Sequence, residues 1–313
     1  MKKYAFGVDI GGTTIKIGFF ETTGKMLDKW EIVTRKENGG SLILGDIEAS
    51  IEEKLAKEGI SKDDVQGVGM GVPGPVTNGG VVNKCANLGW GVFNVEEEAT
   101  ALFGLPVKAG NDANVASLGE MWMGGGKGYE NVVMVTLGTG VGAGVIIGGK
   151  IVHGTNGAGG EVGHMKVDED ETEVCGCGKT GCLEQYTSAT GVVRLTKRGL
   201  AKGGVETCLT KLDKITCKDV FDAAREGDAF ACEIVEKFGK ILGGALAKVA
   251  CVVDPQVFVI GGGVSKAGQI LIDVVEKNFK AEAFHACENT KIALATLGND
   301  AGMYGCAKMA IDG

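Results

Sequence analysis

The sequence lacks three features that would assign the protein to familiar functional classes. No apolar run approaches the roughly 20 residues that a membrane-spanning helix requires. The apolar stretch after the first three residues is interrupted by Asp9 and then by glycines, which does not fit the apolar core of a secretory signal. An excess of basic residues is also missing, since the formal net charge is -8, and this disfavours non-specific binding to nucleic acid. The sequence therefore predicts a cytoplasmic protein whose partners are neither membranes nor nucleic acid.

Glycine is the residue that the sequence has in excess. The chain holds 54 glycines among 313 residues, and they follow no triplet repeat but gather in short turns after apolar runs. Glycine in such turns lets the backbone approach another group closely. Hydrophobic residues make up 44% of the chain and charged residues 23%, which is typical of a globular protein with a sizeable core. A mass of 32.3 kDa is enough for two domains or lobes.

The most specific pattern is a histidine followed by three cysteines within twenty residues. One nitrogen and three thiolates are the ligand set of a closed, tetrahedral zinc site, and the glycines between the cysteines allow the backbone to fold back on itself. A buried disulfide and chemically inert thiols are the alternatives at this point. Two flanking glutamates are not needed to hold the metal, so they are available for another function. The predicted ligands are His164, Cys175, Cys177 and Cys182, and the flanking carboxylates belong to Glu161 and Glu184.

Two segments share the order apolar run, Gly/Thr turn, apolar run. The first has its turn at residues 11–14 and the second at residues 138–144. Such a turn presents backbone N–H and hydroxyl donors to an anion, and an acid just before it, here Asp9, can hold a metal ion through water. An ordinary hairpin is the alternative for the first segment taken alone. Because neither is a G-x-G-x-x-G motif that opens a helix, two phosphate-binding hairpins in two related lobes are favoured over a dinucleotide-binding fold.

The hydrophobic pattern predicts alternating strands and helices. Apolar residues spaced by three and four predict a helix over 42–55, and a strand over 105–109 places residues 110–113 at its carboxyl end, where open α/β sheets bind ligands. A long helix over 228–253 is predicted to break at Gly243-Gly244. Further strands are expected over 66–72, 256–260 and 292–297, and further helices over 94–104, 188–200, 218–225, 268–280 and 300–311. This order predicts an α/β protein with mixed sheets, whose last helix packs back on the first lobe.

Four motifs together resemble those of the ROK family of sugar kinases and repressors. They are Asp9-x-Gly11-Gly12-Thr13, Leu137-Gly138-Thr139-Gly140-x-Gly142, Gly261-Gly262-Gly263 and Cys175-x-Cys177-Gly178-x-x-Gly181-Cys182-x-Glu184. The resemblance covers nearly the whole chain and implies a two-lobed actin-like ATPase (ribonuclease H-like) fold, with mixed sheets flanked by helices and a structural zinc site. It implies a small α/β lobe of residues 1–112 plus 298–313, a large α/β lobe of residues 113–297 that holds the zinc site, and a cleft that closes over a hexose and ATP.

The resemblance also implies roles for individual residues around the sugar. Asp112 is similar to the family's catalytic base, which accepts the proton of the acceptor hydroxyl in a loose phosphoryl-transfer transition state. The alternative is that Asp112 caps a helix over 113–123, and both roles can hold. His164 would bind zinc through one ring nitrogen while the other points at the sugar. The residues that resemble the family's sugar contacts are Gly71, Asn87, Asn111, Asp112, Glu161, His164 and Glu184.

For the nucleotide, the resemblance implies three groups of contacts. Lys16 lies on a predicted strand, so a solvated position is the alternative for its side chain. The residues implied to face the phosphates and Mg²⁺ are Asp9, Gly11, Gly12, Thr13, Thr14 and Lys16. Those implied to contact the β- and γ-phosphates are Gly138, Thr139, Gly140 and Gly142, and those implied to contact the adenosine are Gly262 and Gly263.

Within the family the chain is most similar to the bacterial glucokinases. The resemblance therefore implies ATP-dependent phosphorylation of the 6-hydroxyl of glucose to give glucose 6-phosphate and ADP, with Mg²⁺, a structural Zn²⁺ and a homodimer. N-acetylglucosamine, N-acetylmannosamine, mannose and fructose are the alternative acceptors, and polyphosphate is not excluded as a donor. A sugar-sensing repressor is disfavoured because the first predicted phosphate strand begins near Tyr4, which leaves no room for an added N-terminal DNA-binding domain.

Overall fold

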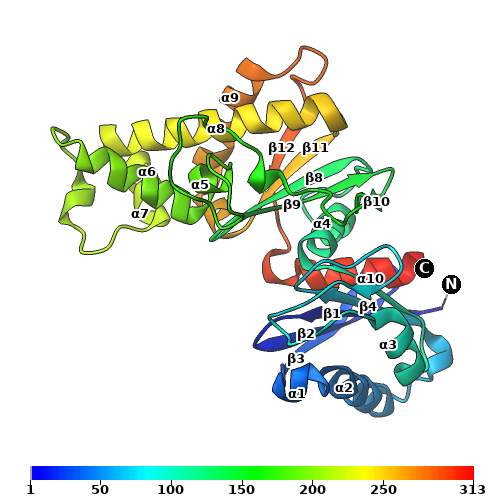
Figure 1. The fold of residues 1–313 in the computed structure, drawn as a ribbon. Helices are drawn as coiled ribbons and strands as arrows, with labels where there is room; N and C mark the ends of the chain where they lie inside the picture. The colour runs from blue at the N-terminus through cyan, green and yellow to red at the C-terminus, as the bar shows by residue number, and fades with distance from the viewer. Residues whose placement is uncertain (1) are drawn as a thin grey trace. The chain divides into compact units, whose positions relative to one another are not determined.

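The computed structural model describes residues 2–313, and their packing divides the chain into two units (Figure 1). The first unit comprises Met1–Glu130, Gly144–Gly159 and Leu297–Gly313, and the second comprises Asn131–Ala143 and Gly160–Thr296. Within residues 2–313, every helix is too short or too polar to span a bilayer.

A five-stranded mixed sheet forms the centre of the first unit. Its strands, in spatial order, are β3 (Met26–Val33), β2 (Thr14–Glu21), β1 (Tyr4–Ile10), β4 (Val65–Val72) and β7 (Val107–Asn111). β1, β4 and β7 are parallel to one another, whereas β1, β2 and β3 are successively antiparallel. β4 is buried along almost its whole length, as expected of a parallel strand covered on both faces.

Helices cover both faces of this sheet (Figure 1). They are α2 (Ile43–Glu58) and α3 (Val95–Phe103) on one face, and α4 (Asp112–Met123) and α10 (Ala301–Asp312) on the other. Ile43, Ile47 and Ile51 of α2 lie in the apolar core beneath the sheet, so the predicted helical spacing is confirmed. α10 packs against β1 and β4, which confirms that the last helix joins the first unit.

The α4 helix also belongs to the first unit by its packing, whereas the expected boundary between the lobes lies at residues 112 and 113. α4 and α10 cross at very short range: a Cβ on Gly305 of α10 would lie 1.6 Å from the carbonyl oxygen of Val115. Only glycine permits this approach, so Gly305 lets the backbones of the two helices pack directly against each other. Residues 113–130 and 144–159 therefore pack with the first unit, and the functional lobe boundaries predicted from the sequence stay a proposal.

The second sheet has the order β10-β9-β8-β11-β12. Its strands are β8 (Val132–Leu137), β9 (Val141–Ile147), β10 (Lys150–Ile151), β11 (Val257–Gly261) and β12 (Lys291–Leu294). β11 is parallel to both β8 and β12, and β10 is antiparallel to β9. The prediction of an α/β protein with mixed sheets is therefore confirmed.

The helices of the second unit pack around one long helix. They are α5 (Glu184–Thr187), α6 (Ala189–Ala201), α7 (Cys217–Arg225), α8 (Ala229–Val253) and α9 (Gln269–Glu282), of which α8 is the long one. The predicted break at Gly243-Gly244 is wrong, because α8 runs through both residues without interruption. A Cβ on Gly243 would lie 2.6 Å from the backbone nitrogen of Phe279, so this glycine allows α9 to pack closely rather than ending the helix.

One strand and several short elements were not expected from the sequence. β3 is an edge strand on which Asp28, Lys29 and Glu31 are exposed or partly exposed, so its charged residues conceal the apolar alternation. The other elements are α1 (Glu37–Gly40), β5 (Val81–Val82) and β6 (Phe93–Asn94), together with short 3-10 turns at Lys62–Asp64, Val162–His164, Cys208–Lys211, Gly263–Ala267 and Gly298–Asp300.

Candidate active site and metal centre

Three parallel strands of the first unit end side by side, and two of the predicted carboxylates lie at their ends. Asp9 of β1 is in register with Gly71 of β4, and Gly71 is in register with Gly110 of β7. The carboxyl ends of parallel strands meet at one edge of the sheet, where α/β proteins bind ligands. Asn111 and Asp112 directly follow Gly110. The structure therefore brings together at one edge residues that the sequence placed in three separate motifs.

Asp112 is the first residue of α4, and the residue before it caps the helix. The side-chain oxygen of Asn111 accepts hydrogen bonds from the backbone N–H groups of Ala113 and Asn114. The alternative that Asp112 is the N-cap is therefore wrong. Oδ1 of Asp112 accepts from the Ala113 N–H at 2.8 Å and from Nδ2 of Asn111 at 2.9 Å. Asn111 thus anchors the start of the helix and also fixes one oxygen of the Asp112 carboxylate.

The two carboxylates at this edge influence each other. Partial desolvation raises the pKa of Asp112, although its side chain is exposed, and the bonds from Ala113 and Asn111 oppose this rise. Burial raises the pKa of Asp9 as well; Lys16 opposes the rise and the negative charge of Asp112 adds to it. Two neighbouring carboxylates with a single nearby cation suit a hard divalent cation, which binds oxygen ligands. The chemistry of this edge therefore fits Mg²⁺.

The first Gly/Thr turn joins β1 to β2, and hydrogen bonds from the residue after β3 hold it in place. The N–H of Gly11 donates to the carbonyl of Thr14 at 3.0 Å, which closes the turn. Thr34, just after β3, donates its hydroxyl to the carbonyl of Gly11 at 2.7 Å and its N–H to the carbonyl of Thr13 at 3.0 Å. The turn is therefore rigid, and Gly12, Thr13 and Thr14 are all at least partly exposed.

Lys16 and Asn87 approach this turn in different ways. The ammonium of Lys16 lies 3.4 Å from the carbonyl oxygen of Asn299, beside a cavity of about 310 Å³ that Lys29, Trp30 and Asp300 also line. Asn87 is exposed on a loop whose backbone oxygen comes within 4.0 Å of the Cβ position of Gly12. The loop that carries Asn87 is thus next to the turn, whereas the Lys16 side chain contacts the 3-10 turn at Gly298–Asp300, just before α10.

The loop after β4 is tied to the same edge. Nδ2 of Asn111 donates to the carbonyl of Gly74 at 3.2 Å, and the thiol of Cys85 donates to the carbonyl of Pro73 at 3.1 Å. Trp90 closes the Asn87 loop, because its backbone oxygen accepts from the N–H of Cys85 at 3.0 Å. The loop after β4 is therefore bonded to Asn111, and the Asn87 loop is bonded to the loop after β4 through Cys85. Asn111 also bonds the Asp112 carboxylate, so both loops predicted to contact sugar are connected to Asp112.

In the second unit, the four predicted metal ligands form one cluster. The ligand atoms of His164, Cys175, Cys177 and Cys182 all lie within 4.8 Å of one another. The sulfurs of Cys177 and Cys182 are 3.6 Å apart, and Nδ1 of His164 is 3.9 Å from the sulfur of Cys175. Tetrahedral zinc with Zn–S bonds of about 2.3 Å places its sulfurs about 3.8 Å apart. The donor set and its spacing fit a zinc ion, and the Nε2 atom of His164 is left for another partner.

Glu184 links this cluster to the second Gly/Thr turn. Its Oε1 atom lies 3.6 Å from the sulfur of Cys175, and its Oε2 atom accepts from the N–H of Val141 at 3.0 Å. A Cβ on Gly140 would lie only 2.1 Å from Oε2, so glycine is required where the turn meets the carboxylate. Glu161 is exposed and begins the short turn that carries His164, whose N–H donates to the carbonyl of Glu161 at 3.1 Å.

The second Gly/Thr turn also rests on the start of α6. The N–H of Ala189 donates to the carbonyl of Gly138 at 2.8 Å, and the hydroxyl of Thr190 donates to the carbonyl of Thr139 at 2.7 Å. On the other side, the hydroxyl of Thr136 in β8 donates to the carbonyl of Gly142 at 3.2 Å. The turn is therefore fixed by hydrogen bonds from both sides.

A cavity of about 410 Å³ lies in the second unit next to the glycines that follow β11. Phe221 and Val264 give it an apolar wall, and Gly263 contributes backbone. The charged residues that line it are Lys218, Asp222, Arg225 and Lys266. Small-molecule sites combine apolar walls with polar groups that orient the ligand, and this cavity has both. The sequence identified Gly262 and Gly263 but gave no signal for Phe221, which looks like any core residue of an amphipathic helix.

A buried carboxylate supports the segment between His164 and Cys175. Glu171 contacts Arg194 and Arg198 of α6 and also accepts from the hydroxyl of Tyr186 at 2.6 Å. The bonds from Arg198 come first among the causes that hold the pKa of Glu171 well below its usual range. Sequence reasoning missed this group, because Glu171 is 23 and 27 residues from its arginines. Only the spacing of the two arginines on one helix face could have indicated it.

Comparison with known proteins places these features in a family. The model of the ROK family matches residues 5–312. A glucokinase from Halalkalibacterium halodurans is 43% identical over 308 residues, which cover 97% of this chain and 93% of the relative.

Two solved structures are similar over almost their whole length. A ROK family glucokinase from Streptomyces griseus, in complex with glucose and AMPPNP, is 34% identical with a TM-score of 0.71, and the match covers 99% of this chain and 100% of that one. The ROK hexokinase from Thermus thermophilus is 28% identical with a TM-score of 0.81, and the match covers 98% and 97% of the two chains. The motifs, the two-unit α/β fold and these matches agree: the chain belongs to the ROK family.

Proposed function

We propose that this protein is an ATP-dependent glucokinase, which transfers the terminal phosphoryl group of ATP to the 6-hydroxyl of glucose. The observation that carries the proposal is the Asp112 carboxylate, held at the carboxyl edge of three parallel strands beside Asp9. The glucokinase relative at 43% identity and the relative bound to glucose and AMPPNP support the same acceptor and donor.

Asp112 acts as the general base in this proposal. Its carboxylate takes the proton of the 6-hydroxyl as the bond between that oxygen and the terminal phosphorus forms and the phosphoanhydride bond breaks, which releases ADP. In a loose transition state the proton moves late, so an aligned carboxylate is sufficient. A raised pKa makes the carboxylate a stronger base than an ordinary aspartate. The hydrogen bonds from Asn111 and Ala113 hold the carboxylate in position.

Sugar and nucleotide contacts follow the family pattern. Gly71, Asn87 and Asn111 in the first unit, and Glu161, His164 and Glu184 in the second, are assigned to the glucose hydroxyls. Gly11, Gly12, Thr13, Thr14 and Lys16 are assigned to the phosphates, as are Gly138, Thr139, Gly140 and Gly142. Gly262 and Gly263 are assigned to adenosine, and the cavity beside Phe221 supports that assignment because its apolar wall suits the base.

Two metal ions complete the proposal. Asp9 would hold Mg²⁺ through water, and the ion, when bound, would neutralise charge on the transferred phosphoryl group. His164, Cys175, Cys177 and Cys182 would hold a structural Zn²⁺, which would fix the His164 turn to the cysteine loop. Neither zinc nor its ligands take part in the transfer itself. A homodimer in the cytoplasm is also part of the proposal, and light scattering on the purified protein checks the dimer.

A panel of sugars tests the function directly. ADP formation is measured with ATP and each of glucose, mannose, fructose, N-acetylglucosamine and N-acetylmannosamine, and we expect glucose to give the highest kcat/KM. A folded, zinc-loaded protein that turns over an N-acetylhexosamine faster than glucose would assign it to another acceptor. A folded protein without turnover on any of the sugars would end the proposal.

A further inference from the structure

Two of the predicted zinc ligands lie on a short hairpin, residues 174–180. The N–H of Cys175 donates to the carbonyl of Lys179 at 2.7 Å, and an antiparallel bridge pairs the first and last residues of the hairpin. These bonds fix the positions of Cys175 and Cys177 relative to each other. The fourth ligand, Cys182, lies beyond the end of the hairpin, so the hairpin bonds alone do not hold it beside the other two cysteines.

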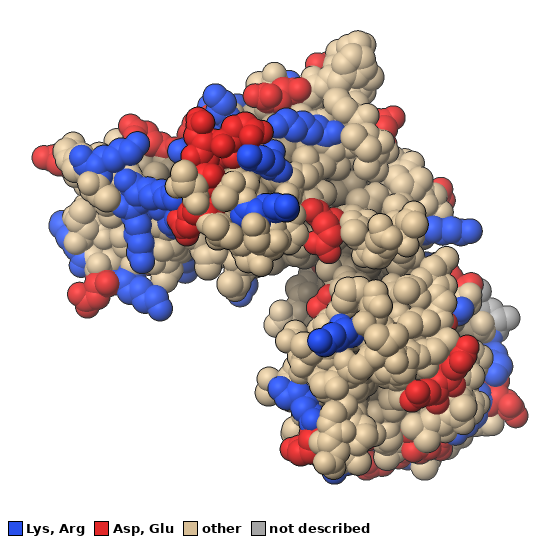
Figure 2. Space-filling view, in the orientation of Figure 1, with Lys and Arg blue, Asp and Glu red and all other residues tan. Residues whose placement is uncertain are grey.

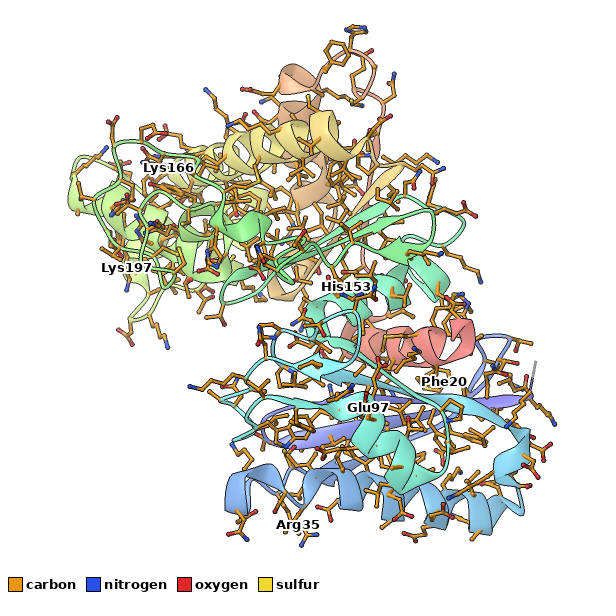
Figure 3. The ribbon with its side chains drawn as sticks, turned by 45° about the vertical axis from the view of Figure 1, so that its right-hand side comes forward. Phe20, Arg35, Glu97, His153, Lys166 and Lys197 are labelled. Carbon is orange, nitrogen blue, oxygen red and sulfur yellow. The ribbon has the colours of Figure 1, made fainter. Side chains whose placement is uncertain are left out.

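Cys182 belongs to a second set of backbone contacts, on the side of the histidine ligand. It pairs in an antiparallel bridge with Lys166, which Figure 3 labels and which follows His164 by two residues. Along the chain, one residue separates Cys182 from the hairpin. That residue is Gly181, which has a φ of 75°, and glycine adopts many backbone conformations. A single covalent connection of this kind lets the hairpin rotate against Cys182 unless another contact opposes the rotation.

The side chain of Gln185 supplies a contact across this joint. Its Oε1 atom accepts from the N–H of Cys182 at 3.0 Å. Its Nε2 atom donates to the carbonyl of Glu173, just before the hairpin, at 2.9 Å. A neutral side-chain amide has the acceptor and the donor that these two backbone groups require. One side chain therefore bonds the backbone on both sides of the joint at Gly181.

The backbone of Gln185 is itself held from two sides. Its N–H donates to the carbonyl of Cys182 at 3.0 Å, and its carbonyl accepts from Nη1 of Arg194 at 2.7 Å. Arg194 also contacts the buried carboxylate of Glu171, and Figure 2 shows acidic and basic side chains close together on this part of the second unit. Gln185 is thus fixed to α6 through Arg194, so its amide acts from a rigid base.

We propose that Gln185 is a positioning residue of the zinc site, which sets how tightly the hairpin and Cys182 together hold the metal. The inference rests on the structural zinc of the proposed function. Neither bond of the Gln185 amide uses a ligand atom, so both can form before the metal enters. The ligands are then ordered during folding rather than at metal binding, and such preorganisation raises affinity. Groups that orient metal ligands change metal affinity by about 10- to 100-fold.

Gln185→Met tests the proposal, because methionine keeps the length of the side chain and removes both hydrogen bonds. The full-length, reduced protein is stripped of metal and titrated with zinc in competition with a coloured chelator. We expect the variant to bind zinc about 30-fold more weakly than wild type. The matched control is Gln269→Met on α9, which removes an exposed glutamine bonded to Asp273 and should bind zinc as wild type does.

Hydrogen exchange at the Cys175 amide separates positioning from a general loss of stability. This amide donates to Lys179, and the substitution removes neither partner. In the metal-free variant it should exchange about tenfold faster than in metal-free wild type, because the hairpin moves against Cys182, and excess zinc should restore the slow exchange. If Gln185 only supported the fold, exchange would instead rise throughout α6 and zinc affinity would stay unchanged.

Three results would overturn the inference. They are an unchanged zinc affinity in Gln185→Met, an equal loss of affinity in Gln269→Met, and a Gln185→Met protein that stays unfolded in excess zinc. The last would make Gln185 a residue that the fold itself requires. Failure of the proposed function gives a different result: a wild type that binds no zinc ends the zinc proposal, and one without glucose turnover ends the kinase proposal. A wild type and a variant that bind zinc equally well end this inference alone.

Discussion

Asp112 and Glu171 are carboxylates of one chain in opposite electrostatic surroundings. Glu171 is buried and surrounded by donors, because Arg194, Arg198 and Tyr186 all contact it, and its pKa is lowered. Asp112 is exposed at the end of a sheet, its contacts are the neutral groups of Asn111 and Ala113, and its pKa is raised. Within residues 2–313, the chain thus pairs the Glu171 carboxylate with cations and gives the Asp112 carboxylate only neutral hydrogen-bond partners.

The difference separates a structural acid from a reactive one. A carboxylate already paired with two guanidinium groups has no tendency to take a proton, so it can hold a loop but cannot act as a base near neutral pH. A carboxylate whose ionised form is disfavoured accepts a proton readily. Asp9 lies between these extremes, because burial and Asp112 raise its pKa while Lys16 opposes the rise.

The largest effect is expected from Asp112→Asn. The amide keeps the shape and can still accept from Ala113, but it cannot take a proton, so we expect kcat to fall by about 10³-fold. The KM for glucose should stay within about threefold, since the hydroxyl contacts remain. Steady-state assays over a range of glucose concentrations measure both values, and a thermal melt checks the fold. A kcat close to that of wild type would contradict the role of Asp112 as the base.

Glu171→Gln should affect stability rather than catalysis. Removing the charge leaves two arginines without their buried partner, and breaking a buried ion pair costs about 3 kcal/mol of unfolding free energy. Urea unfolding measures the loss. The matched control is Glu173→Gln, which removes an exposed carboxylate from the same arginines and should cost no more than about 0.5 kcal/mol. Equal losses for the two variants would mean that burial does not distinguish them.

The pH dependence of this loss has a definite sign. The folded pKa of Glu171 lies below its unfolded value, so its stabilising contribution is complete above the unfolded pKa of about 4.3 and is lost as the pH falls toward the folded pKa. Wild type and Glu171→Gln should therefore differ most near neutral pH and converge on acidification. A difference that grows as the pH falls would contradict this assignment.

Cys177→Ser tests the metal cluster of His164 and the three cysteines. Glu171 lies in the segment that connects His164 to Cys175. Cys177 is the exposed thiol of the four ligands, so its loss should lower the zinc content without leaving a cavity in the core. We expect a loss of about 2 kcal/mol, less than zinc contributes to small peptides, since a domain of this size has its own core. The KM for glucose should rise through Glu161 and His164. Zinc per chain is measured by mass spectrometry, with Cys208→Ser, an exposed thiol outside the cluster, as the control.

A smaller effect is expected in the pH profile of activity. A base must be ionised to act, and a raised pKa for Asp112 means that kcat/KM falls on acidification at a higher pH than the ordinary aspartate value of about 3.9. Initial rates at low glucose, between pH 8 and the onset of acid unfolding, give this limb. A flat profile down to pH 4 in a folded enzyme would show that burial does not affect the Asp112 carboxylate as stated.

The sequence predicted those parts of the site whose residues are close together along the chain. His164 and the three cysteines lie within twenty residues, so their spacing was enough to predict the cluster. The two Gly/Thr turns were also recognisable as local motifs, and the α/β order followed from periodicity. The register of Asp9, Gly71 and Gly110 could not be read, because it depends on which strands pair.

Contacts between distant residues account for what was missed. Glu171 and its arginines form no short motif, and Gly243 looks like a helix breaker until α9 is known to pack against it. The sequence alone also allows Asp112 as a helix cap, and the structure gives that role to Asn111, one residue earlier. In each case the structure specifies a contact that the local sequence pattern alone does not.

Lys16→Gln should give the smallest effect. It tests Asp9, the carboxylate whose surroundings are intermediate between those of Glu171 and Asp112. The ammonium of Lys16 opposes the rise in the pKa of Asp9, and it also lies 3.4 Å from the carbonyl oxygen of Asn299. Without it, Asp9 is harder to ionise, and the proposed phosphate contact is lost, so we expect the KM for ATP to rise about threefold. Excess Mg²⁺ should restore part of the loss, because the cation also favours the ionised form. Lys25→Gln, an exposed lysine outside the site, is the control. If Lys16→Gln leaves the KM for ATP and its Mg²⁺ dependence unchanged, Lys16 is a solvated strand residue, and Asp9 is ionised without its help.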